Sequence, residues 1–328
     1  MSMDKQDFNA LVDLAMANPA LSAMRPVVEK ELLHYELFQA LDAEGLLKDL
    51  VFQGGTCLRL CRGSDRFSED LDFAGGEDFS AQGMGRIKAC VEKRIGERFG
   101  LKVAVSNKPP KVADDSIPHV RVDKWWITIE TAPENPSLPR QRIKLEIANI
   151  PAYTRELVAL RVNYEFLAGM PTVLVNAESL DEIMADKVLA FPTSLLDRQG
   201  QAVASDSNKI RHRDIWDLAW LSSRGAKLDV RLVVAKIADY SVTDYAGLLE
   251  RAIVQLPAIV KSGEFKAQMG RFIDSATVAK TLANEAYADY LAASVGSLFA
   301  QMRAVLADLA LAKPEPDQGP AMGKVAPR

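Results

Sequence analysis

The spacing of apolar positions changes along the chain, and these changes predict its secondary structure. Residues 27–47 repeat apolar side chains at helical spacing, and residues 49–53 form a short apolar run that predicts a buried strand. A second helical segment covers residues 79–99, and further strand-like runs lie at 101–106, 126–131, 142–150 and 172–175. Because helices and strands are interspersed, we predict an α/β (α+β) unit in which helices flank a mixed sheet.

The second half of the chain shows helical periodicity without further strand signals, from Ser179 to about Ala312. Residues 312–328 are rich in Pro and Gly and have little to bury, which predicts a flexible tail. We therefore divide the chain into a mixed core with N-terminal helices over 1–176, an all-α C-terminal domain over 177–311, and this tail.

Composition is that of an ordinary globular protein and argues against several kinds of site. The chain has 328 residues, of which 48% are hydrophobic and 26% are charged. Three cysteines are too few for a disulfide framework, and three histidines leave little material for a zinc site or a Ser/His/Asp triad. Neither a signal-peptide pattern nor a run of about 18 apolar residues occurs. We therefore predict a cytoplasmic protein with no membrane partner.

Charge is distributed unevenly within a chain of net charge -4. The stretch from Arg86 to Lys124 contains ten Lys and Arg residues against five Asp and Glu residues. Such a stretch is most often the solvated face of a helix. Beside an acidic site, a local basic patch would also suit a polyanionic partner such as RNA.

Two acidic residues stand two positions apart in the segment FSEDLDF. In a strand, Asp70 and Asp72 project from one face, with backbones roughly 6.6 Å apart, while Leu71 and Phe73 project into the core. Two carboxylates on one face repel each other unless a cation lies between them, and Mg²⁺ is commonly held by one or two carboxylates plus substrate phosphates. We predict that Asp70 and Asp72 bind Mg²⁺, with Mn²⁺ as the alternative ion. A polar strand face or a turn is the other interpretation of so short a motif.

A third carboxylate comes from the segment RIKLEIA. Apolar residues at 143, 145 and 147 project to one side of this predicted strand, so Glu146 projects to the other side together with Lys144. If the strand lies beside the Asp70 segment, Glu146 completes a set of three carboxylates of the kind that holds two metal ions. A cross-strand ion pair between Glu146 and a basic neighbour is equally compatible with the pattern.

The stretch Gly54-Gly55-Thr56 precedes the acidic segment and links the predicted strand at 49–53 to a helix. Glycines allow a backbone to approach a bulky anion, and the free N–H groups at a helix start favour negative charge. The three residues are therefore predicted to bind the phosphates of a nucleotide. The alternative is a plain strand-to-helix turn in which Thr56 is the N-cap.

The motifs GGTCLRL…RFSEDLDF, SLDEIMADKVLAF and RHRDIWDLAWL together resemble the AbiEii/AbiGii toxin family, a branch of the DNA polymerase β-like nucleotidyltransferases. They span Gly54 to Leu221 in the family's order, with GGT where many related enzymes carry GS. The resemblance implies a minimal nucleotidyltransferase core with a helical C-terminal half that completes the active site. It further implies Mg²⁺-dependent use of a nucleoside triphosphate, with GTP or CTP as candidates.

The same resemblance implies a biological role, the toxin of a toxin–antitoxin or abortive-infection system whose antitoxin is encoded nearby. Some members of the family modify the 3′ end of tRNA, so tRNA is the expected acceptor. A protein or small-molecule acceptor, a metal-dependent glycosyltransferase and a catalytically inactive binding module are the alternatives.

The later motifs supply further candidates. Ser179 and Glu182 form a predicted capping box, after which Lys187 falls on an otherwise apolar helical stripe. A lysine there either extends outward to solvent or reaches a buried anion, and the family match favours the triphosphate. Asp214 is the family's candidate for orienting Lys187 or the acceptor, whereas Asp217 is expected on a solvated face. The predicted catalytic set is thus Asp70, Asp72, Lys187 and Asp214.

Ser68 lies two residues before the first aspartate and beside the predicted phosphate site. Its simplest role is a turn hydrogen bond, and it is also a candidate nucleotide-binding residue. Some family members are silenced by phosphorylation of a serine in this motif, where a phosphate would add repulsion beside the two aspartates.

Overall fold

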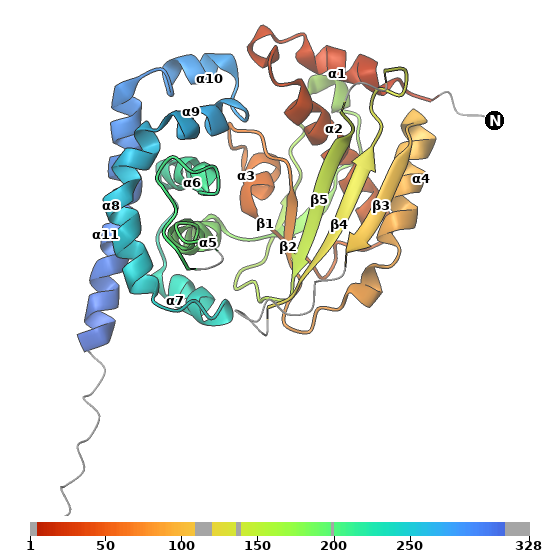
Figure 1. The fold of residues 1–328 in the computed structure, drawn as a ribbon. Coiled ribbons are helices and arrows are strands. Elements are labelled where there is room, and N and C mark those ends of the chain that lie inside the picture. Colours follow the sequence, from red (N-terminus) through yellow and green to blue (C-terminus); the bar gives the residue numbers. More distant parts are fainter. Residues whose placement is uncertain (1–4, 109–119, 136–138, 198–199, 312–328) are drawn as a thin grey trace, which may run out of the picture.

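The computed structural model describes residues 5–108, 120–135, 139–197 and 200–311 (Figure 1). Within these residues one mixed seven-stranded sheet has the order β3-β4-β5-β2-β1-β7-β6. The β1–β7 and β2–β5 pairs are parallel and the other pairs are antiparallel. The strands are β1 Val51–Gln53, β2 Leu71–Ala74, β3 Val103–Lys108, β4 Val122–Ile129, β5 Gln141–Ala148, β6 Glu156–Ala159 and β7 Leu174–Ala177.

Most strands lie close to the apolar runs of the sequence, and β6 is the exception. β6 is a short edge strand, and Glu156, Leu157 and Ala159 on it are exposed. Val158 alone on this strand packs partly against the core, so β6 leaves no alternating pattern for a sequence-based prediction to detect.

Helices of the first half cover one face of the sheet. α2 contacts β5, α4 contacts β3, and the two helices pack against each other. The segment predicted as a helix over 79–99 is divided by Gly83 and Gly85 into a short 3₁₀ turn, η2 Ala81–Met84, and the helix α4. The elements are α1 Phe8–Met16, η1 Pro19–Leu21, α2 Arg25–Ala43, α3 Gly54–Arg62, α4 Ile87–Phe99 and η3 Glu165–Leu167.

Beyond β7 the described residues form helices, joined by loops with one isolated bridge between Leu196 and Ala202. α5 packs against α6, α7 and α8, and α11 packs along α8 and α6 (Figure 1). The mixed sheet followed by an all-α half is therefore confirmed. The helices are α5 Leu180–Thr193, α6 His212–Ser223, α7 Val230–Asp239, α8 Tyr245–Lys261, α9 Gly263–Gly270, α10 Ser275–Lys280 and α11 Glu285–Leu311. The predicted tail over 312–328 lies outside the described residues.

The core is continuous between the two halves. The rings of Phe38, Phe52 and Phe73 join α2 to β1 and β2, with centroids 5.0 Å apart for Phe38–Phe52 and 5.1 Å for Phe52–Phe73. The same cluster of buried apolar side chains extends to Phe191 on α5 and Phe299 on α11, whose rings stack. The helical half is thus fixed against the sheet.

The helix α11 is long and largely apolar. Residues 285–308 of α11 have a mean hydropathy of 1.2 and enough length to cross a membrane. Leu291, Val295, Phe299 and Met302 on this helix are buried against the other helices. A helix in the core of a protein can have the same length and composition, so these two properties do not identify α11 as a membrane-spanning helix.

Candidate active site

The turn between β1 and α3 brings the backbone close to two charged side chains. Gly54 has a φ of 77°, a conformation that residues with a Cβ rarely adopt. A Cβ on Gly54 would lie 3.0 Å from Asp72 Oδ2, and a Cβ on Gly55 would overlap the Arg66 guanidinium. The close approach of these side chains therefore requires both glycines.

Thr56 is buried and makes its contact within the protein. The helix α3 begins at Gly54 with Gln53 as its N-cap, so the interpretation of Thr56 as the N-cap is wrong. The Thr56 hydroxyl donates a hydrogen bond to the carbonyl oxygen of Asp70. Its side chain therefore fixes α3 against the acidic segment and lines neither cavity beside it.

Strand pairing brings the three predicted carboxylates together. β2 and β5 are parallel neighbours in which Asp72 and Glu146 are register partners, as the sequence interpretation requires. Asp70 lies immediately before β2, and all three side chains line the same cavity. Burial, and then the charges of Asp70 and Glu146, raise the pKa of Asp72 to about 6. The three carboxylates therefore repel one another.

Two lysines lie among these carboxylates. Lys144 Nζ is 3.1 Å from Asp70 Oδ2 and 2.7 Å from Glu146 Oε2, and Lys124 Nζ is 2.5 Å from Glu146 Oε1. The cross-strand ion pair considered for Glu146 is thus present, since Lys124 is its register partner on β4. In the described part of the chain, no three His, Cys, Asp or Glu side chains are placed to hold a metal ion as they stand.

Lys187 is buried on α5 rather than extended into solvent. Its Nζ lies 2.8 Å from Asp214 Oδ1 and 2.7 Å from Asp217 Oδ2. Burial alone would lower the pKa of Lys187, but the two carboxylates raise it above its ordinary value, so the ammonium is charged. Burial raises the pKa of Asp214, but the charges of Lys187 and then Arg211 outweigh burial and hold this pKa well below its ordinary value. The expected pairing of Lys187 with Asp214 is present.

Asp217 contradicts its prediction, because it is fully buried rather than on a solvated face. It accepts hydrogen bonds from Nε and Nη2 of Arg66 and also contacts Lys187. Arg211 Nε donates to Asp214 Oδ2 at 2.8 Å, so cations and carboxylates alternate along the row Arg66, Asp217, Lys187, Asp214, Arg211. The row connects the loop before β2 to α5 and α6, and it neutralises two buried carboxylates with three cations.

The capping box at the start of α5 forms only in part. Ser179 Oγ accepts a hydrogen bond from the Glu182 backbone N–H, as predicted. The Glu182 carboxylate accepts from Tyr153 and Thr154 instead of the Ser179 backbone, and Lys236 Nζ lies 2.9 Å from it. The helix start is therefore tied to the loop before β6.

Two cavities meet at the site, and both are lined by Gly54, Asp72, Glu146, Lys187, Arg211 and Asp214. The first has a volume of about 380 Å³, and its other walls are polar, including Gly55, Arg66, Ser68, Asp70, Lys144, Lys209 and Arg213. The second has a volume of about 440 Å³ and a largely apolar wall, including Phe73, Val122, Ile183, Leu189, Tyr240 and Val242. A ligand with one polyanionic end and one flat apolar end would match this pair.

The basic stretch between Arg86 and Lys124 is dispersed. Arg86 pairs with Glu44, and Arg94 and Arg98 pair with Glu36, all on the helices α2 and α4 or beside them. Residues 109–119 of the stretch lie outside the described residues. Among its described cations, Lys124 lines the second cavity.

Residues 36–293 match the sequence profile of the family described as nucleotidyl transferase AbiEii toxin, type IV toxin–antitoxin system. This chain belongs to the AbiEii family. The match covers every candidate site residue from Gly54 to Asp217, and it confirms the resemblance of the sequence motifs. The protein is therefore a nucleotidyltransferase of a toxin–antitoxin family. No curated protein matches the chain in sequence.

Two solved structures are similar to this chain. MenT4, a nucleotidyltransferase toxin from Mycobacterium tuberculosis H37Rv, is 19% identical with a TM-score of 0.53, and the match covers 89% of this chain and 88% of that chain. JHP933 from Helicobacter pylori is 18% identical with a TM-score of 0.46, over 87% of this chain and 95% of that chain. The first similarity supports a shared fold.

Several residues of the site escaped the sequence interpretation. Arg66 stands inside the motif RFSEDLDF, and its charge inside an otherwise buried segment is the signal that could have identified it. Lys144 was placed on the correct face of its strand, but its contacts depend on the pairing of β5 with β2 and β4. Asp217 looks like a surface residue from its helix alone, since its partners lie on other elements.

Proposed function

We propose that this AbiEii-family enzyme transfers a nucleotide from a nucleoside triphosphate to the 3′ end of an RNA, with tRNA as the acceptor. The observation that carries the proposal is the meeting of a polar and an apolar cavity at Asp72 and Lys187. The donor nucleotide and the acceptor can meet there with cations on one side and carboxylates on the other.

In this proposal the triphosphate lies in the polar cavity and the nucleoside in the apolar one. Gly54 and Gly55 at the start of α3 line the polar cavity, so the backbone N–H groups of this turn are the proposed phosphate donors, and Ser68 lies beside them. Thr56 contributes by fixing α3 against the acidic segment. Lys187 borders both cavities, so its buried ammonium suits the phosphate that links them. GTP and CTP are the first triphosphates to test.

Asp70, Asp72 and Glu146 are the proposed metal ligands. The donor set fits Mg²⁺ or Mn²⁺, because carboxylate oxygens are the ligands of hard dications and the site already accommodates the Lys144 ammonium between two of the carboxylates. A bound dication would neutralise the charge of the triphosphate and of the leaving pyrophosphate.

The transfer itself exchanges one bond at the α-phosphorus for another. The acceptor hydroxyl oxygen forms a bond to this phosphorus and its proton passes to the Asp72 carboxylate, while the bond from phosphorus to the bridging oxygen breaks and pyrophosphate leaves. Asp72, at the boundary of the cavities, is placed to hydrogen-bond the acceptor hydroxyl, and Lys187, held by Asp214, is placed to hold the phosphate in line. The helical half over 177–311 contributes Lys187 and Asp214, which is the sense in which it completes the active site.

The acceptor is proposed to enter past the loop that precedes α6. Lys209 is exposed there, and the Arg213 guanidinium lies 4.6 Å from the centroid of the buried Phe272 ring. Cations beside a site bind the phosphates of single-stranded RNA. The described part of the stretch from Arg86 to Lys124 is less suited, since several of its cations lie 2.8 to 2.9 Å from carboxylates, whereas Arg213 lies 3.7 Å from Glu69.

Expression in bacteria tests this proposal in the cell. The chain alone should arrest growth and leave extra nucleotides on tRNA 3′ ends, the product of the neighbouring antitoxin gene should protect, and Asp70→Asn should remove both effects. Asp78→Asn is the matched control, because Asp78 is exposed and lines neither cavity. Arrest with unmodified tRNA and labelled protein would favour a protein acceptor, and arrest by Asp70→Asn would favour a binding module. A labelled nucleotide-sugar tests the glycosyltransferase alternative, and fractionation tests the proposed cytoplasmic location.

A further inference from the structure

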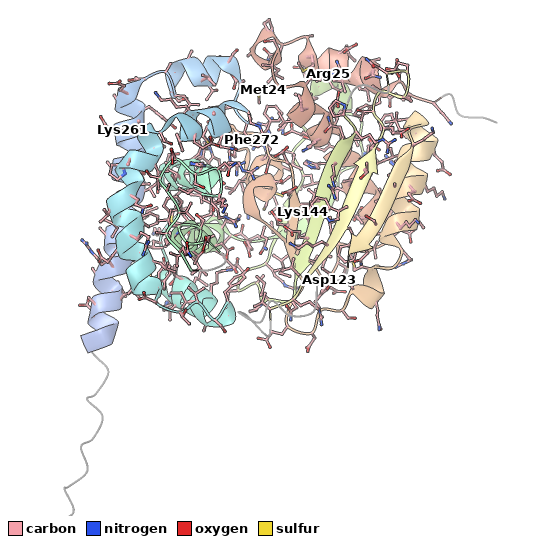
Figure 2. All side chains as sticks on the ribbon, viewed as in Figure 1. Met24, Arg25, Asp123, Lys144, Lys261 and Phe272 are labelled. Carbon is pink, nitrogen blue, oxygen red and sulfur yellow. The ribbon has the colours of Figure 1, made fainter. Side chains whose placement is uncertain are left out.

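Lys144 lies where a cation would bridge the acidic residues of the site. It projects from β5 into the space between the sheet and the C-terminal helices, and its ammonium contacts Asp70 at 3.1 Å and Glu146 at 2.7 Å (Figure 2). These are two of the three carboxylates proposed to bind metal. Lys124 contacts Glu146 from the opposite side, through its other oxygen, at 2.5 Å.

When no dication is bound, the Lys144 ammonium reduces the electrostatic repulsion among the carboxylates. Asp72 and Glu146 are register partners on neighbouring strands, and like charges so placed destabilise a sheet. The Lys144 ammonium offsets the repulsion within the acidic cluster by contacting Asp70, immediately before β2, and Glu146 on β5. It also competes with any dication, since the same oxygens of Asp70 and Glu146 cannot serve both cations at full strength.

Lys144 also has an alternative anion within the same cavity. Its side chain is 23% exposed and lines the polar cavity of about 380 Å³, together with Gly55 and Ser68, where the triphosphate is proposed to lie. Lysine has a flexible stem of four carbons, so its ammonium can move to a phosphate while its backbone stays in β5.

We propose that Lys144 exchanges partners when the substrate binds: it holds Asp70 and Glu146 in the free enzyme and moves to the triphosphate when a dication takes its place. This inference rests on the proposed function, because it takes a triphosphate as the second partner. Its consequence is coupling between the two ligands. A dication alone binds weakly because it displaces Lys144, and it binds more tightly when a triphosphate receives the displaced ammonium.

Binding measurements without turnover test the exchange. Mn²⁺ alone is titrated into the full chain and followed by electron paramagnetic resonance, and inorganic tripolyphosphate is titrated at a fixed, saturating concentration of Mn²⁺. Lys144→Met removes the charge while keeping much of the side-chain volume. We expect it to tighten Mn²⁺ binding about tenfold, the effect of losing one close competing charge, and to weaken tripolyphosphate binding about as much.

Two further variants separate this role from a structural one. Lys144→Arg keeps the charge and should retain the weak Mn²⁺ binding of the wild type. Lys102→Met removes a charge from an 83% exposed side chain, whose partner Glu130 is 3.7 Å away and outside the site, and should change neither affinity. Thermal unfolding of each variant in chelator shows whether the fold is retained.

These binding measurements test the exchange by Lys144 without depending on which acceptor the enzyme uses. Tighter Mn²⁺ binding together with weaker tripolyphosphate binding in Lys144→Met supports the exchange, even if the wild type transfers nothing to RNA. Unchanged or weaker Mn²⁺ binding would overturn it, because Lys144 would not compete with the dication. Tighter Mn²⁺ binding with unchanged tripolyphosphate binding would also overturn it, since the displaced ammonium would then have no phosphate partner.

Discussion

Replacing Asp72 with Asn should make the free protein more stable while abolishing nucleotide transfer. Burial and the nearby charges of Asp70 and Glu146 raise the pKa of Asp72 to about 6, so its ionised form is unfavourable in the folded chain. Asn keeps the size of the side chain and removes the charge. The variant therefore loses the repulsion and with it the proposed metal site.

The magnitude follows from the two pKa values. The interval between the ordinary 3.8 and about 6 corresponds to about 3 kcal/mol at neutral pH, and solvent in the cavity reduces this to about 1–2 kcal/mol. Because the folded protein binds the proton more tightly than the unfolded chain, Asp72 destabilises the fold progressively as pH rises from about 4 to about 6. Below that range the carboxyl is protonated in both states and the penalty vanishes.

Urea denaturation in chelator at pH 4, 5, 6 and 7.5 measures this effect. The free energy of unfolding of Asp72→Asn should exceed that of the wild type at pH 7.5, and the difference should shrink toward zero at pH 4. Taking the difference between the two proteins removes the contribution of the other carboxylates that titrate in this range. A variant less stable than the wild type at pH 7.5, or a difference independent of pH, would refute the reasoning.

The remaining predictions concern the buried charges and the RNA contact. Asp217→Asn should lower the free energy of unfolding, measured by urea denaturation, by about 3–5 kcal/mol, because Arg66 and Lys187 both lose a charged partner in the interior. A loss under about 1 kcal/mol would count against the buried row of charges. Lys187→Ala should cost a similar amount and weaken tripolyphosphate binding, since two buried carboxylates each lose one of their two cations; full stability would contradict this. Arg213→Ala should weaken RNA binding and lower its salt dependence, whereas Arg86→Ala should change neither. Equal effects of the two variants would contradict an RNA contact confined to the loop before α6.

The sequence predicted those parts of the site that follow from local periodicity. Alternation along a strand placed Asp70 with Asp72 and set Glu146 on the face opposite the core, and the sheet made these strands neighbours. Helical spacing placed Lys187 among apolar residues, where it is buried. In each case one element determines the direction of the side chain, so a single sequence carries the information.

The parts that the sequence did not predict depend on contacts between elements. Asp217 was assigned to solvent because its own helix gives no sign of Arg66, which lies 151 positions earlier in the chain. The strand pattern places Lys144 on the same face as Glu146, but the contact of Lys144 with Asp70 requires the parallel pairing of β2 and β5. Interactions of this kind are set by tertiary packing. The local spacing of apolar residues carries no information about them.

The most direct test of the central claim is transfer in a purified system. The wild-type chain is incubated with Mg²⁺, total RNA and each labelled nucleoside triphosphate in turn, and the labelled products are sequenced from their 3′ ends. We expect label on tRNA 3′ ends from a preferred triphosphate, and none with Asp70→Asn or without Mg²⁺. Label on protein or on small molecules, with tRNA ends untouched, would contradict the assignment of the acceptor, and undiminished labelling by Asp70→Asn would contradict the site itself.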